Sequence, residues 1–127
     1  MPLFRHHALL FAPEELTDAP LTGPVFRIRP SNGDSLLDRD QHWYVLIDLL
    51  REGDGLATAA LSTSFDGVLW HPAAKISARR SPQVVDLVDL PVLAPFVRVE
   101  TALQGEGLKH RVVARLASDG PFTVQPG

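Results

Sequence analysis

The chain is interrupted at short intervals by 11 prolines and 9 glycines among its 127 residues. Proline removes a backbone donor and glycine permits positive φ, so both residues usually mark turns and strand ends. Between them lie short runs rich in Val, Leu, Ile and Phe, and no long run keeps a 3.6-residue period. This regular recurrence of short runs favours a β-sandwich or a barrel.

Strict alternation identifies the clearest strands. In residues 42–50, Trp43, Val45, Ile47 and Leu49 share one face, and residues 96–103 alternate in the same way. Further strands are expected at residues 25–29, 56–65, 68–76, 110–118 and 122–124, and at 83–90, where the spacing also suits one helical turn. We therefore predict an all-β fold, an antiparallel jelly-roll-like β-sandwich of about seven or eight strands.

The first 24 residues contain four prolines and look different from the rest. We predict two parts, an extended N-terminal arm at 1–24 and the β-sandwich domain at 25–127, with one helical turn at 13–16 in the arm. An arm of this kind wraps its own domain or a neighbouring copy. A disordered tail is the alternative.

Composition limits the function. A formal net charge of −3 argues against general binding to nucleic acids or acidic membranes. The absence of cysteine excludes disulfides, thiolate catalysis and cysteine-ligated zinc. No apolar run approaches the roughly 20 residues that span a bilayer, and residues 1–11 do not resemble a signal peptide. We expect a soluble protein that is made in the cytoplasm without a signal peptide.

The most informative stretch runs from Ser64 to Trp70 and reads S-F-D-G-V-L-W. Asp66 and Gly67 form a favoured hairpin pair, because Asp accepts bonds from turn amides and Gly adopts positive φ. The stretch ends one strand at Ser64 and begins the next, so that Trp70 packs on the core.

This S-x-D-G-x-x-W pattern resembles the discoidin-like, or galactose-binding-like, β-sandwich domains. Those domains continue with an aromatic-x-Arg-Val/Leu strand, which residues 96–99 (F-V-R-V) resemble. Similar hairpins occur in head-decoration and tail-associated structural proteins of tailed bacteriophages. The first group implies a sugar or lipid site on the loops, for which no residue here matches. The second implies an assembly role through arms and faces, which the proline-rich segment suits.

Candidate chemistry is sparse. The five histidines show no paired spacing of the kind that zinc sites have, so we expect no metal site and no cofactor. No G-x-S-x-G is present, and the carboxylate pairs fall in expected loops. We therefore expect no catalytic residue and no enzyme activity. Trp43, Tyr44 and Trp70 could together form a platform for a sugar, although alternation favours a core position for the tryptophans.

From these patterns we predict a non-enzymatic structural protein of a virion or virion-like particle, in a capsid decoration or a tail, that contacts copies of itself and a larger shell. The alternative is a carbohydrate-binding module that uses the loops around Asp66 to Trp70. Candidate interface residues are Phe4, Leu9, Leu10, Phe11, Tyr44 and Arg98.

Overall fold

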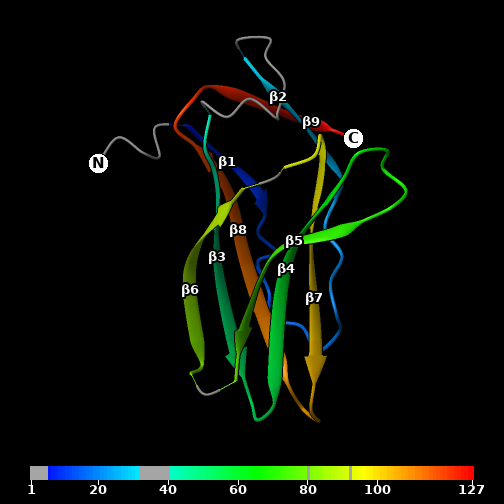
Figure 1. The fold of residues 1–127 in the computed structure, drawn as a ribbon. Helices are drawn as coiled ribbons and strands as arrows, with labels where there is room; N and C mark the ends of the chain where they lie inside the picture. The colour runs from blue at the N-terminus through cyan, green and yellow to red at the C-terminus, as the bar shows by residue number, and fades with distance from the viewer. Residues whose placement is uncertain (1–5, 32–40, 80, 92) are drawn as a thin grey trace.

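Two antiparallel sheets packed face to face make up the computed structural model, which describes residues 6–31, 41–79, 81–91 and 93–127 (Figure 1). The nine strands are β1 (His6–Phe11), β2 (Phe26–Pro30), β3 (Trp43–Glu52), β4 (Leu56–Ser64), β5 (His71–Ala78), β6 (Gln83–Leu90), β7 (Phe96–Gln104), β8 (Lys109–Ser118) and β9 (Phe122–Pro126). The four-stranded sheet has the order β1-β8-β3-β6, and the five-stranded sheet has the order β5-β4-β7-β2-β9. The prediction of an all-β antiparallel sandwich is confirmed.

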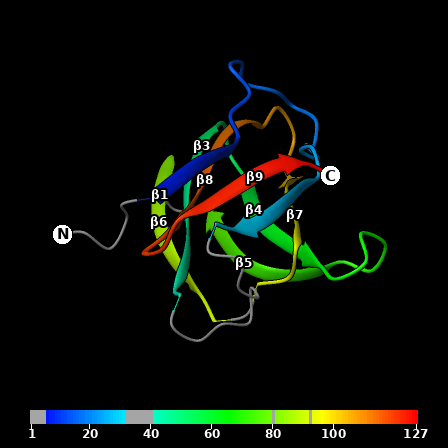
Figure 2. The ribbon, with the colours of Figure 1, turned by 90° about the horizontal axis from the view of Figure 1, so that it is seen from above.

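The core lies between the sheets and is built by alternation. Val45, Ile47 and Leu49 of β3 are fully buried, as are Ala57, Ala59 and Leu61 of β4. Figure 2, seen from above, shows β6, β3 and β8 on one side of this core and β5, β4 and β7 on the other. Because inward and outward positions alternate, each sheet keeps a second face that points away from the core.

Trp43 belongs to this core, as alternation predicted. Its side chain is buried and its ring meets that of Phe122 edge to face, with centroids 5.0 Å apart. Such an offset aromatic pair contributes about 0.5–1.5 kcal/mol beyond its buried area. The pair closes one end of the sandwich, where β9 follows β8.

Part of the segment that we expected to be an arm, 1–24, is itself a strand of the sandwich. β1 pairs with β8 along the edge of the four-stranded sheet, from His6 opposite Ser118 to Phe11 opposite Ala114. Residues 14 and 15 form bends where one helical turn was expected, so that expectation is wrong. Six residues of mixed character, HHALLF, give no clean alternation, which is why the sequence did not predict this ninth strand.

The segment after β1 then crosses from one sheet to the other. Thr17 pairs with His110 of β8, and Leu21 and Gly23 bond to the β7 backbone at Thr101 and Val99. These backbone bonds are 2.7–3.0 Å long. The segment therefore covers the open side of the sandwich between β8 and β7.

Within the described residues no helix is present that could span a bilayer.

Candidate functional site

The turn between β4 and β5 is held by a tight set of hydrogen bonds. The Ser64 hydroxyl donates to Asp66 Oδ1 (3.0 Å) and accepts from the Gly67 amide (2.8 Å). Asp66 Oδ1 also accepts from the amides of Val68 (2.8 Å) and Leu69 (2.9 Å). Gly67 has a φ of 79°, which glycine adopts without strain. The S-x-D-G motif thus forms the turn that was predicted from the sequence.

These bonds also set the charge state of the turn. The backbone amides of Leu69 and Val68, and then the Ser64 hydroxyl, hold the pKa of Asp66 below its ordinary value. Donors that bond to the charged carboxylate favour that form. The turn is therefore built around an ionised Asp66, and it projects from the end of the sandwich in Figures 1 and 2.

A bulge decides where Trp70 lies. Along the pairing of β4 with β5, Leu61 lies opposite Ala74, but the next residue, Ser62, lies opposite Pro72. One residue of β5 therefore has no paired residue on β4. An extra residue reverses the alternation of everything before it, because side chains alternate with a period of two. Ala74 and Ile76 therefore face the core, whereas Pro72 and Trp70 lie on the outer face.

Trp70 is half-buried and stacks on a side chain of β7. The Arg98 guanidinium carbon lies 4.2 Å from the centre of the Trp70 ring, which is cation–π geometry. Arg98 Nε is also paired with Glu100 Oε1, the next outward residue of the same strand. Trp70, Arg98 and Glu100 thus form one connected row, and the ion pair fixes the guanidinium against the ring.

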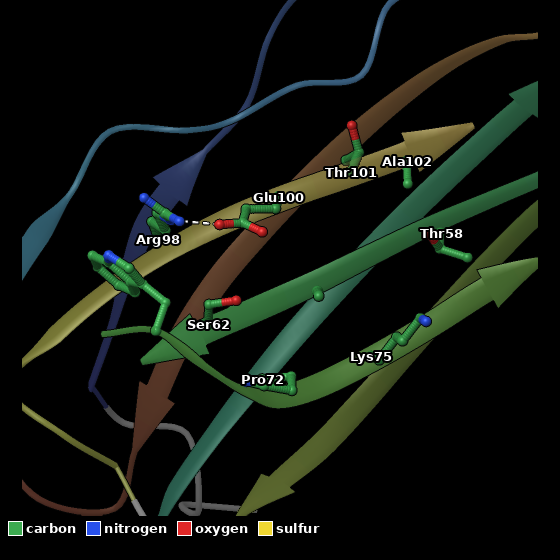
Figure 3. A pocket seen from close by; sticks show the side chains of 10 residues that line it. Thr58, Ser62, Pro72, Lys75, Arg98, Glu100, Thr101 and Ala102 are labelled. Atoms are coloured by element: carbon green, nitrogen blue, oxygen red, sulfur yellow. Dashed lines mark hydrogen bonds and ion pairs between the residues drawn. The ribbon is translucent and has the colours of Figure 1, made fainter. Parts of the chain in front are cut away.

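This row borders a groove of about 380 Å³ on the outer face of the five-stranded sheet. Figure 3 shows the side chains that line it, which come from three neighbouring strands. They are Thr58, Ala60 and Ser62 of β4, Pro72 and Lys75 of β5, and Arg98, Glu100, Thr101 and Ala102 of β7, with Trp70 just before β5.

The groove combines an apolar wall with hydrogen-bonding groups. Trp70 and Pro72 supply the apolar surface, and the small side chains of Ala60 and Ala102 leave open space above the sheet. Hydroxyls, one ammonium, one guanidinium and one carboxylate supply both donors and acceptors. A flat or elongated polar molecule with an apolar face fits this combination.

The other aromatic residues of the predicted platform lie elsewhere. Trp43 is in the core, and Tyr44 is on the outer face of the four-stranded sheet, so neither joins Trp70. Trp70 itself is not a core residue, which corrects the expectation from alternation. The alternation pattern did not predict the bulge, so Trp70 was assigned to the wrong face. Pro72 is the residue that indicates a bulge in the sequence, because proline within a sheet is confined to edges, strand starts and bulges.

The candidate interface residues are similarly dispersed. Leu9 is exposed on β1, Leu10 is buried, and Phe11 packs against the core from a half-buried position. Arg98 belongs to the groove, and Phe4 lies outside the described residues.

The other groove residues were not predicted from the sequence. Ser62 and Lys75 belong to the β4–β5 hairpin, whereas Glu100 comes from β7, so only the strand order brings Glu100 beside them. Among the described residues, no group of three or more His, Asp or Glu side chains could hold a metal ion.

The sequence matches no protein-family model and no curated protein. Among solved structures, a mutant family 29 carbohydrate-binding module complexed with cellulohexaose has a TM-score of 0.47 and 14% identity, over 91% of this chain and 92% of that chain. Another structure of a family 29 carbohydrate-binding module has a TM-score of 0.44 and 14% identity, over 91% and 89%.

These comparisons contradict the prediction of a virion structural protein. The three matching structures are carbohydrate-binding modules, and the phage, capsid and tail assignments have no support among them. The prediction depended on a short hairpin pattern. Such a turn forms wherever an Asp-Gly pair joins two strands, so it does not identify a class of protein. The broader resemblance to galactose-binding-like β-sandwiches agrees with the observed fold at the level of the sandwich.

Proposed function

We propose that this domain binds carbohydrate without acting on it, in the groove beside Trp70 on the outer face of the five-stranded sheet. The observation that carries the proposal is the position of Trp70. Its indole is half-buried on the outer face, is fixed by Arg98, and borders a groove lined by hydroxyl and charged groups. An amphipathic ring of this kind offers an apolar surface to the C–H face of a sugar, while polar neighbours bond its hydroxyls.

The polar groups are spaced for a sugar chain. Lys75 of β5 and Glu100 of β7 lie on either side of Thr58 and Ser62 of the central strand β4, so the groove carries donors and acceptors on both sides and on its floor (Figure 3). Sugar hydroxyls both donate and accept, and a site with carboxylate, ammonium and hydroxyl groups matches both functions. The groove is open along the sheet, which suits an internal stretch of a polysaccharide.

The same groove argues for binding over hydrolysis. Most glycoside hydrolases place two carboxylates on either side of the scissile bond. Glu100 is the single carboxylate among the described residues that line this groove, and its charge is paired with Arg98. We therefore expect a ligand to be held and released unchanged.

The test is affinity gel electrophoresis through a panel of soluble polysaccharides, first of the wild type and then of Trp70→Ala. Removal of a stacked aromatic costs about 1–3 kcal/mol, by analogy with base stacking on aromatic side chains, which weakens binding about 5- to 150-fold. Val68→Ala is the matched control, since Val68 lies in the same turn and is 75% exposed.

Circular dichroism of both variants checks that they fold. The proposal fails if no polysaccharide retards the wild-type protein, or if folded Trp70→Ala protein migrates like the wild type. It also fails if Val68→Ala weakens binding as much as Trp70→Ala, because the turn and not the groove would then carry the ligand.

A further inference from the structure

The outer face of the four-stranded sheet carries an exposed apolar row. Leu9 of β1, Leu46 of β3 and Leu87 of β6 are 46%, 36% and 41% exposed. The strand register places them at one level, with Arg115 of β8 between Leu9 and Leu46. The solvated face of an antiparallel sheet is normally polar, so three leucines in line indicate a contact surface.

The charges on this face are sorted by strand. Lys109, Arg111 and Arg115 are exposed on β8, whereas Asp48 and Glu52 lie on β3 and Asp89 lies on β6. The half of the face toward β1 is therefore basic, and the half toward β6 is acidic. A surface with this division is complementary to itself after a half-turn.

We propose that two copies of this chain associate through this face, about a two-fold axis that runs parallel to the strands between β8 and β3. Such an axis exchanges β8 with β3 and β1 with β6, and it keeps each residue at its own level along the strands. Leu9 then lies opposite the partner's Leu87, because both belong to the same row.

The same operation brings two pairs of charged or polar groups face to face, whereas Arg111 and Arg115 lie at the levels of Leu50 and Leu46. His7 lies at the level of Asp89, and so faces the partner's Asp89. Lys109 lies at the level of Glu52, and so faces the partner's Glu52. Basic β8 therefore meets acidic β3 at the centre of the interface, which suppresses other registers.

The available area suits a reversible dimer. β1, β8, β3 and β6 have 6, 10, 10 and 8 residues, and at ~3.3 Å per residue and ~4.8 Å per strand their outer face covers roughly 540 Å². Two such faces bury about 1,100 Å², which is in the range of weak, transient interfaces. We therefore expect a concentration-dependent equilibrium between monomer and dimer, and not an obligate dimer.

The test is sedimentation velocity of the whole chain, with two single variants, Leu9→Glu and Leu87→Lys. In the dimer, each variant places two charges opposite leucines of the partner, so each should weaken self-association at least about tenfold. When the two variants are mixed, one contact regains two leucines and the other gains an opposite-charge pair. The mixture should therefore form a heterodimer, although each variant alone is monomeric.

Val68→Glu is the control, because it adds the same charge to an exposed apolar position of the β4–β5 turn, away from this face. It should sediment like the wild type. The proposal is overturned if the wild type stays monomeric up to about 1 mM, which would leave this face to a different partner. It is also overturned if the single variants still dimerise, or if mixing them fails to restore a dimer.

Discussion

A buried histidine links the segment between β1 and β2 to both sheets, and its replacement should measurably destabilise the fold. His110 of β8 is fully buried. Its Nδ1 lies 3.0 Å from the Thr17 carbonyl oxygen, and its Nε2 lies 2.6 Å from the Thr101 hydroxyl. A carbonyl oxygen only accepts, so Nδ1 carries the proton and Nε2 accepts from Thr101. Thr101 in turn accepts from the Leu21 amide at 2.8 Å.

The change His110→Phe keeps the ring and removes both nitrogen contacts. The Thr17 carbonyl keeps the His110 backbone amide as a donor, at 2.9 Å, so its loss is small. The Thr101 hydroxyl loses its acceptor inside the core. A net hydrogen bond contributes about 1 kcal/mol, and an orphaned buried donor costs about 1–3 kcal/mol more. We therefore expect the free energy of unfolding to fall by about 2–4 kcal/mol.

Urea unfolding at 25 °C, followed by tryptophan fluorescence, measures this difference. The double-mutant cycle with Thr101→Val isolates the pair, and neighbours in one network typically couple by about 0.5–3 kcal/mol. Exposed Lys109→Ala is the control, with an expected change within about 0.5 kcal/mol. The reasoning is refuted if His110→Phe costs no more than this control, or if the double variant equals the sum of its singles.

Three further predictions concern the turns and the core. Hydrogen bonds hold the pKa of Asp66 in the folded protein below its unfolded value of about 3.9. They therefore stabilise the fold above the unfolded pKa, and this stabilisation is lost as the pH falls through the folded pKa. Thermal unfolding between pH 2.5 and 7 should show a weaker acid dependence in Asp66→Asn, and an unchanged dependence would contradict this. Gly55→Ala should destabilise the protein more than Gly67→Ala, because a Cβ at Gly55 would overlap the Gln104 carbonyl oxygen whereas a Cβ at Gly67 meets open space. At Gly67 only the left-handed backbone conformation is costly for alanine, by about 1–2 kcal/mol. Equal losses of the free energy of unfolding in urea would refute the packing argument. Trp43→Ala should cost about 3–5 kcal/mol, as a large buried aromatic does, and a loss below about 1 kcal/mol in the same assay would show that Trp43 is not in the core.

The strands were predictable because alternation depends on local spacing. The runs around Trp43 and Val99 alternate cleanly, and the structure buries those faces. β1 was not predictable, because it depends on pairing with β8, more than 100 residues further along the chain. Its leucines face both outward and inward, so no polar side marks the solvent face.

The groove was predictable only in part. The turn at Asp66 follows from local chemistry, and the sequence identified it. The side taken by Trp70 depends on a bulge opposite Ser62, and the contact with Arg98 depends on the order of β4 and β7 in the sheet. Both are properties of strand pairing across the sheet, which spacing along one chain does not determine.

The most direct test of carbohydrate binding is a ¹⁵N-resolved NMR titration with soluble hexasaccharides of glucose, mannose and xylose. If the account holds, at least one sugar shifts the Trp70 indole N–H signal together with amides of Ser62, Lys75 and Glu100, and leaves the four-stranded sheet unchanged. No saturable shift with any of the three, or shifts confined to the four-stranded sheet, would contradict a glycan site at Trp70.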